Sequence, residues 1–179
     1  AQAISAAPPG ATIVVSTPVA QEGIVIDRPL TILGDPIVNI GTKDPCFHPL
    51  LLPIELAGPG FGKVALVRVN VRQCVDGYEM PPVMAGGGFD ELHVYDSTIR
   101  SSRTGNTGHG TGNAAISVTV PYVLISRSTV EGGADGIDSC PWLGFGPGMT
   151  PFLAYPAVEA PESVVTVLDS TLRGGSHNF

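Results

Sequence analysis

The sequence predicts an all-β solenoid, a stack of coils whose strands run parallel to one another. The first observation is that four stretches nearly repeat one another: VALVRVNVR (64–72), LHVYDSTIR (92–100), VLISRSTVE (123–131) and VTVLDSTLR (165–173). The second is that their last apolar residues recur at spacings of 28, 31 and 42 residues, as in repeat proteins. The third is that β-branched and aromatic residues dominate and apolar side chains alternate two apart. Stacked coils of this kind bury a continuous core that no single coil could bury.

Each repeat is expected to form a strand, a bend, a second short strand and a turn. The first strand is marked by the apolar pairs Val64/Leu66, Leu92/Val94, Val123/Ile125 and Val165/Val167. The bend is marked by Arg68-Val69, Asp96-Ser97, Arg127-Ser128 and Asp169-Ser170, and the second strand by Val71, Ile99, Val130 and Leu172. Five residues later lie Asp76-Gly77, Thr104-Gly105, Asp135-Gly136 and His177-Asn178. Because Gly and Asn accept a left-handed backbone, each coil is expected to turn at this shared place.

The repeat pattern V-x-V-x-(D/R)-S-T-(I/V/L)-(R/E) resembles the right-handed parallel β-helix of the pectin-lyase-like superfamily. The stretch 3–34 (AISAAPPGATIVVSTPVAQEGIVIDRPLTILG) is similar to the usual start of that fold. It offers a short helix, a Gly before a strand, a Pro-containing turn, a Glu and an I-x-I followed by Pro-Leu-Thr-Ile-Leu-Gly. The resemblance implies one right-handed, single-stranded parallel β-helix domain over residues 1–179, with a short N-terminal helix and Pro/Gly-rich loop insertions. It leaves open whether this domain is part of a longer chain.

Function is implied only broadly, since the superfamily holds lyases, hydrolases, esterases, phage tailspikes and adhesins. We predict a non-catalytic exported scaffold or glycan-interacting domain, because no complete catalytic motif is present. The first alternative is a fragment of a polysaccharide lyase or glycoside hydrolase. The second is a tailspike- or adhesin-like assembly protein, which would show a self-complementary apolar patch around Trp142 and Phe152.

Composition fits many short strands joined by tight turns. Only 14% of the residues are charged, 23 are Gly and 17 are Pro, and mean hydropathy is +0.26. The net charge of −7 argues against nucleic acid as a partner held by bulk electrostatics. No uninterrupted apolar stretch reaches the length of a membrane helix, so no membrane insertion is expected.

The three cysteines leave two interpretations open. No CxxC or Cys/His spacing suggests zinc. Cys46 and Cys74 are 28 residues apart, one coil by the repeat count, so they could form a disulfide between adjacent rungs or remain buried thiols. The low Lys content (Lys43 and Lys63) and the richness in Thr, Ser and Gly favour a secreted or cell-surface protein.

Insertions between the repeats hold most of the Pro, Gly, Met and aromatic residues. They cover 44–60, 76–88, 101–113 and 140–161. Insertions of a solenoid often build its binding face, but apolar ones can instead cover the core or pack on a neighbour. The last repeat is followed by no evident capping segment, which exposes strand edges at the solenoid end. A homo-oligomer or a neighbouring domain could dock through these loops and this open end.

Catalytic candidates come from one incomplete match. Asp135-Gly136-Ile137-Asp138 resembles the N-x-D-G-(I/F)-D segment of polygalacturonase-type glycosidases, in which carboxylates act as acid and base. Gly108-His109-Gly110 is similar to the Gly-His-Gly of that family. Gly133 stands where the family has Asn, however, no Asp-Asp pair follows, and Gly-His-Gly precedes the Asp segment instead of following it. Asp135, Asp138 and His109 are therefore candidates that a turn explains equally well.

No resident cofactor is expected, and calcium is the metal left open. Lyase chemistry of this superfamily usually needs carboxylates gathered around calcium and a basic residue. The acidic candidates are scattered: Asp90, Glu91, Asp96, Asp135, Asp138 and Asp169. Asp96 and Asp169 share a column with Arg68 and Arg127 in which the sign of the charge alternates, as in a structural salt-bridge ladder.

The histidines do not form an obvious site. His93 lies between two core positions of a strand, His109 lies in a Gly-rich loop and His177 lies at a turn. No two of them share a column, so structural or solvated roles are predicted.

A column of arginines is the functional surface that the sequence favours. Arg72, Arg100, Glu131 and Arg173 each follow the aligned apolar residue by one position, so they are expected to point outward on one face. Guanidinium groups at a rung spacing of about 4.8 Å could bind the carboxylates of an acidic polysaccharide. Arg72, Arg100 and Arg173 are therefore the predicted glycan-binding residues, with an ordinary solvated face as the alternative.

Overall fold

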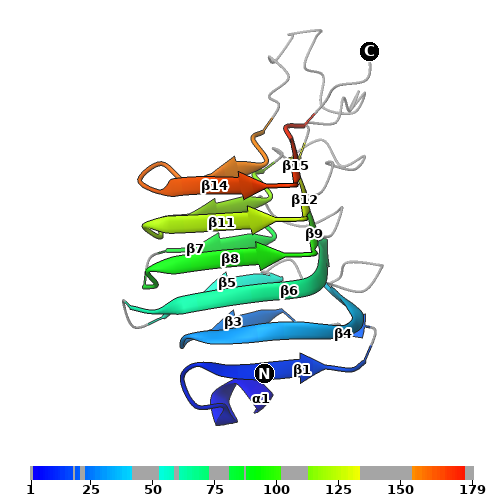
Figure 1. Cartoon of the computed structure of the whole chain (residues 1–179), viewed down its shortest axis with the longest axis vertical. Coiled ribbons are helices and arrows are strands. Elements are labelled where there is room, and N and C mark those ends of the chain that lie inside the picture. Colours follow the sequence, from blue (N-terminus) through cyan, green and yellow to red (C-terminus); the bar gives the residue numbers. More distant parts are fainter. Residues whose placement is uncertain are drawn as a thin grey trace, which may run out of the picture.

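The chain folds into two parallel β-sheets that face each other, with one short helix at one end (Figure 1). In the computed structural model the described residues are 2–17, 19–20, 23–41, 53–58, 61–72, 81–86, 88–101, 113–133 and 155–175. Helix α1 spans Gln2–Ala6, in agreement with the short N-terminal helix expected from the sequence. No helix in these ranges is long and apolar enough to cross a bilayer.

The larger sheet has ten strands and the smaller has five. Strands of the larger sheet are β1 (Ala11–Val15), β2 (Val19–Ala20), β4 (Leu30–Ile40), β6 (Lys63–Arg72), β8 (Glu91–Tyr95), β9 (Thr98–Arg100), β11 (Tyr122–Ser126), β12 (Thr129–Glu131), β14 (Val164–Leu168) and β15 (Thr171–Arg173). Strands of the smaller sheet are β3 (Ile24–Ile26), β5 (Ile54–Leu56), β7 (Val83–Ala85), β10 (Ile116–Val118) and β13 (Val158–Glu159).

The chain winds through the same three strand positions again and again. It follows β8, β9 and β10 in one coil, then β11, β12 and β13 in the next, and each strand pairs in parallel with its counterpart. Figure 1 shows these coils lying one above the other. This all-β arrangement of parallel, curled sheets is compatible with a solenoid-like fold.

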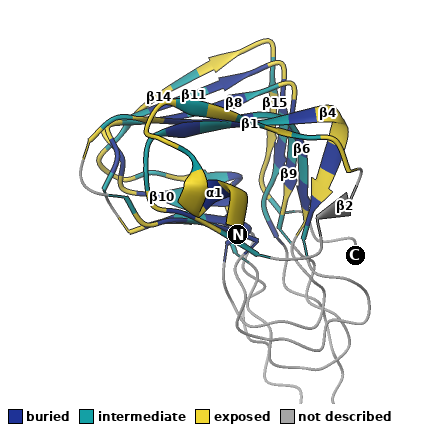
Figure 2. Cartoon of the chain, turned by 90° about the horizontal axis from the view of Figure 1, so that it is seen from below, coloured by how far each residue is buried: buried dark blue, intermediate teal, exposed yellow. Residues whose placement is uncertain are grey.

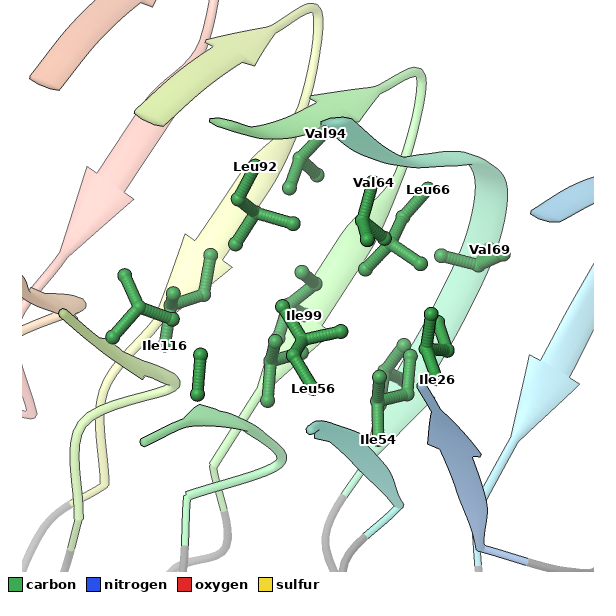
Figure 3. Packing of buried hydrophobic residues seen from close by; sticks show 14 of the residues in the cluster. Ile26, Ile54, Leu56, Val64, Leu66, Val69, Leu92, Val94, Ile99 and Ile116 are labelled. Carbon is green, nitrogen blue, oxygen red and sulfur yellow. The ribbon is translucent and has the colours of Figure 1, made fainter. Parts of the chain in front are cut away.

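The aligned apolar column of the sequence is a column in space. Val71 pairs with Ile99, Ile99 with Val130, and Val130 with Leu172. The first three are fully buried, and the row also continues backward to Ile40, which pairs with Val71. The inward side chains of both sheets meet in this core, as Figure 3 shows for Leu56, Leu92 and Ile99 among others.

The bend between the two halves of the larger sheet uses a left-handed residue in each repeat. These residues are Arg68, Asp96, Arg127 and Asp169, with φ of 53°, 49°, 47° and 48°. Non-glycine residues rarely adopt this conformation, and Asp does so more readily than most. The bend predicted from the polar pairs is therefore confirmed. The Gly- and Asn-containing turns predicted five residues after the column fall outside the described residues.

A ladder of serines stabilises the bends from coil to coil. The N–H of Val69 donates to Ser97 Oγ (3.1 Å), that of Ser97 to Ser128 Oγ (3.1 Å), and that of Ser128 to Ser170 Oγ (3.0 Å). The Ser97 and Ser128 hydroxyls donate in turn to the carbonyl oxygens of Tyr95 and Ser126. At this sharp corner the buried N–H groups would otherwise lack acceptors. Each serine hydroxyl supplies the acceptor for the N–H group of the preceding coil.

The rung that contains β4 was missed in the sequence because its bend is longer. In β4, residues 34–37 stand opposite the single residue Arg68, which shifts the register between Leu33 and Val38. A Cβ on Gly34 would lie 2.3 Å from the Arg68 carbonyl oxygen, so only glycine fits there. This insertion interrupts the repeat pattern while the strands on either side keep their pairing.

Helix α1 closes the N-terminal end of the core. Ile4 is buried in the hydrophobic cluster. Arg28 Nη1 donates to the carbonyl oxygens of Ser5 (3.3 Å) and Ala7 (3.1 Å), which ties the helix to the chain after β3. Figure 2 shows α1 lying across this end, between the two sheets.

Candidate functional site

The predicted arginine column lies on the surface of the larger sheet. Arg72 is the last residue of β6, Arg100 of β9, Glu131 of β12 and Arg173 of β15, and they are paired in that order. We call these four residues the arginine row. Each follows a residue of the apolar column, so the strand alternation turns their side chains outward.

Glu131 divides its carboxylate between the two arginines beside it. Arg100 Nε lies 2.9 Å from Glu131 Oε2, and Arg173 Nη1 lies 3.9 Å from Glu131 Oε1. The two arginine side chains remain 51% and 70% exposed, so these contacts are screened by water and fix geometry weakly. With three arginines and one glutamate, the row keeps a formal charge of +2 on a chain whose net charge is −7.

Arg72 is the arginine of the row that has no carboxylate partner among the described residues. It is exposed and forms no ion pair with any described residue, and its neighbour in the row is Arg100. On its other side lies Gly41, whose missing Cβ would approach the Arg72 carbonyl oxygen to 2.5 Å. Only glycine therefore fits at this position, and no side chain at residue 41 can bind the Arg72 guanidinium in place of a ligand.

A second row of polar side chains runs beside the arginine row. We call it the polar row, and it consists of Asn39, Asn70, Thr98, Thr129 and Thr171, each paired with the next. Asn70 Nδ2 donates to Asn39 Oδ1 at 2.7 Å. These residues are not among the sites predicted from the sequence. Their sequence signal is an Asn or Thr two positions before Arg72, Arg100, Glu131 and Arg173.

A cluster around His93 lies on the outer face of the first half of the same sheet. Glu91, His93 and Tyr95 alternate with the buried residues Leu92 and Val94 along β8, so all three point outward. His93 Nδ1 lies 3.0 Å from the Tyr95 hydroxyl, and His93 Nε2 lies 2.8 Å from Glu91 Oε2. The motif E-x-H-x-Y on a predicted strand is the sequence signal for this cluster, which the spacing of the histidines alone does not reveal.

Two tyrosines enclose the imidazole. The Tyr95 and Tyr122 rings meet the His93 ring edge-on, with centroids 5.7 and 5.9 Å away. Burial lowers the pKa of His93, Lys63 acts in the same direction, and Glu91 opposes them. The imidazole is therefore neutral near pH 7. A proton on Nε2, which faces the carboxylate but has no well-aligned hydrogen bond, leaves Nδ1 to accept the Tyr95 hydroxyl.

Comparisons of the chain with protein-family models, curated proteins and solved structures found no match. The function is therefore inferred from the arginine row, the polar row and the His93 cluster.

The remaining candidates are structural or fall outside the described residues. Asp90 Oδ2 accepts the N–H of Gly62 at 2.7 Å, and Asp96 and Asp169 belong to the bends. Within the described ranges, no three Asp, Glu, His or Cys side chains gather where they could hold a metal ion. The residues singled out in the sequence that lie outside the described ranges are Asp135, Asp138, His109, His177, Cys46, Cys74, Trp142 and Phe152.

Proposed function

We propose that the chain is a right-handed parallel β-helix of the pectin-lyase-like kind that acts as a non-catalytic, exported scaffold binding acidic polysaccharide. The fold part of this proposal is supported by the three parallel strands that each coil contributes and by the spacing of the coils. Export is supported by the composition, which is poor in Lys and rich in Thr, Ser and Gly.

One observation carries the binding proposal. Arg72 and Arg100 are direct neighbours on adjacent rungs, and no carboxylate lies between them in the row. Adjacent strands lie about 4.8 Å apart, less than one screening length of about 8 Å, so the two arginines attract a carboxylate together. Arginine also binds carboxylates through two parallel hydrogen bonds, which a lysine cannot do.

The polar row would complete the contact with a sugar chain. Thr98 and Thr129 present hydroxyl groups beside Arg100 and Glu131. Each hydroxyl can both donate and accept a hydrogen bond. A neutral hydroxyl next to a cation suits a uronic acid, whose ring carries hydroxyls and one carboxylate. A chain of such units lying along the coil axis would meet a polar side chain beside an arginine at the rungs of Arg72, Arg100 and Arg173, and Thr129 beside Glu131 at the rung between the last two.

Titration with polygalacturonate tests the proposal. We expect binding at about 50 mM salt that weakens strongly near about 500 mM, because the contacts are exposed charges. The Arg72→Ala, Arg100→Ala double variant should bind about 5- to 30-fold more weakly, equivalent to about 1–2 kcal/mol. Its thermal unfolding should be unchanged.

The matched control is the Arg68→Ala, Arg127→Ala double variant, which loses the same charge from the bends. It should bind like the parent chain. No binding at low salt, or equal loss in both double variants, would contradict a site at the arginine row.

The His93 cluster favours a second candidate function, proton transfer on a polysaccharide by a lyase or hydrolase. Glu91, His93 and Tyr95 bring a carboxylate, an imidazole and a phenol into contact, and such groups can move a proton between them. Our first proposal expects no release of unsaturated or reducing ends from polygalacturonate, alginate or pectin, with or without calcium. Turnover that disappears in His93→Gln and Tyr95→Phe would instead support the enzyme. Turnover that disappears in Asp135→Asn or Asp138→Asn would support the resemblance to glycosidases.

A further inference from the structure

Glu131 lies in the arginine row at the place that a carboxylate of a ligand would take. Its Oε2 lies 2.9 Å from Arg100 Nε and its Oε1 lies 3.9 Å from Arg173 Nη1, so two guanidinium groups share one carboxylate. The Glu131 side chain is 27% exposed, less than either arginine. The pairing of β9, β12 and β15 fixes this order along the stack of coils (Figure 1). The chain therefore makes for itself the contact that a bound uronic acid would make.

A ligand carboxylate at the rung of Glu131 is repelled, and a neutral sugar there is not. Like charges at adjacent positions of a sheet destabilise a contact, and the two carboxylates would compete for the same guanidinium groups. A sugar hydroxyl can instead donate a hydrogen bond to the Glu131 carboxylate, which accepts only. Thr129 lies two positions earlier on the same face of β12 and adds a hydroxyl that donates and accepts. This rung therefore suits an uncharged unit.

Gly41 bounds the basic part of the row at its other end. A Cβ at this position would lie 2.5 Å from the Arg72 carbonyl oxygen, so the rung beside Arg72 adds no side chain to the row. Between Gly41 and Glu131 lie two consecutive basic rungs, those of Arg72 and Arg100. One pyranose unit of an extended sugar chain is about as long as one rung, about 4.8 Å. Two acidic sugar units therefore span the basic part of the row.

We propose that the arginine row binds two consecutive uronic acid units and places an uncharged sugar unit over Glu131. This inference rests on the proposed function, because it assigns the length and the charge pattern of the sugar chain that the same site binds. The ligand class is a mixed polysaccharide in which short acidic runs adjoin neutral sugars. A continuous polyuronate still binds through Arg72 and Arg100, but its further carboxylates add no affinity. Glu131 is the residue that determines this specificity.

Titration with digalacturonate and trigalacturonate, followed by NMR, measures how many acidic units the row accepts. In the parent chain the two affinities should agree within about twofold, because the third carboxylate meets either Gly41 or Glu131. In Glu131→Gln, trigalacturonate should bind about 3- to 5-fold more tightly than digalacturonate, the size of one exposed ion pair. The third carboxylate can then take the place of the Glu131 carboxylate between Arg100 and Arg173.

Two controls accompany this comparison. Glu55→Gln removes the same charge from an outward position of β5, in the smaller sheet, and should keep the ratio of affinities found for the parent chain. The second control needs no variant and so does not depend on how Glu131→Gln folds. Trigalacturonate with a methyl ester on one terminal carboxylate is tested for each end in turn, and one of the two esters should bind the parent chain at least as tightly as trigalacturonate does.

The outcomes separate this inference from the proposed function. It would be overturned by a parent chain that binds trigalacturonate more tightly than digalacturonate and both esters, or by a Glu131→Gln variant that keeps the ratio of the parent chain. It would also be overturned if polygalacturonate bound through Arg72 and Arg100 while neither oligosaccharide bound, since the site would then need more than two units. In each of these cases binding of acidic polysaccharide at the arginine row would stand. A parent chain that binds no polygalacturonate would overturn both proposals.

Discussion

Arg127 holds the carboxylate of Asp96 on the preceding coil through two parallel hydrogen bonds, from Nε to Oδ1 at 2.7 Å and from Nη2 to Oδ2 at 2.8 Å. Both residues occupy the left-handed bend position, so the backbone conformation points their side chains at each other. Hydrogen bonding to Arg127 lowers the pKa of Asp96, and the same contact raises the pKa of Arg127. One rung earlier, Arg68 Nη1 lies 3.8 Å from Oδ1 of Asp35, a residue outside the column predicted from the sequence, so among the described residues the predicted column contains one ion pair, that of Asp96 with Arg127.

The left-handed bend predicts how Arg68 tolerates substitution. A non-glycine residue at φ of 53° is strained, and a β-branched one is strained most. Arg68→Val should be less stable than Arg68→Gly by about 1–2 kcal/mol in urea unfolding. Both variants lose the contact to Asp35, so the difference between their stabilities measures the cost of the left-handed backbone conformation. Equal midpoints would show that the bend relaxes without cost.

The serine ladder predicts a loss of stability in Ser128→Ala. Ser128 is buried, and its hydroxyl accepts the N–H of Ser97 while it donates to the Ser126 carbonyl oxygen. Removing it leaves a buried N–H without an acceptor, which costs about 1–3 kcal/mol. Ser117→Ala is the control, because its hydroxyl bonds to the exposed Glu159 and should change little. Equal effects of the two changes in urea unfolding would contradict a stabilising ladder.

The apolar column predicts that substitutions cost more stability in its middle than at its end. Ile99→Ala should destabilise the chain by about 2–5 kcal/mol, since Ile99 is fully buried and a cavity would remain. Leu172→Ala, in the same column but 40% exposed, should cost less than about 2 kcal/mol. Ile99→Asp should unfold the domain, because a buried unpaired charge costs several kcal/mol. If Ile99→Asp melted like the parent chain, the column would not be a core row.

The fold followed from the sequence wherever side chains repeat in register. Val71, Ile99 and Val130 were aligned correctly because burial on one face of a stacked strand permits only apolar residues. The coils that contain β1 and β4 were not recognised as copies, since the longer bend of β4 breaks the spacing of the repeats. An insertion such as that at 34–37 changes the spacing of the repeat in the sequence even though the strands on either side stay paired.

The candidate sites were only partly predictable for a different reason. The outward position of the arginine row followed from strand alternation, but the division of Glu131 between Arg100 and Arg173 depends on side-chain conformations across rungs. The His93 cluster combines three residue types on one strand with Tyr122 from the next. Such mixed contacts have no period in the sequence, so a search for repeated or identical residues passes over them.

His93 predicts a loss of stability on acidification. Its pKa in the folded chain is lowered, chiefly by burial, from an ordinary value of 6.5. The unfolded chain therefore takes up the proton first as the pH falls, and stability is full above about pH 6.5 and decreases below it. The groups that face the ring are Glu91 and Tyr95 on β8, Tyr122 on β11 and Lys63 on β6.

The measurement is urea unfolding of the parent chain and of His93→Gln between about pH 7.5 and pH 5. The parent chain should lose stability across this range, and the variant should lose less, because its amide does not titrate. Asp96 also has a lowered pKa, but its contribution is lost only as the pH falls below its ordinary value of 3.8 and onward, well outside this window. The other three histidines are common to both proteins and cancel in the comparison. Parallel pH profiles for the two proteins would mean that the imidazole is solvated and that its contacts with Tyr95 and Tyr122 do not persist in solution.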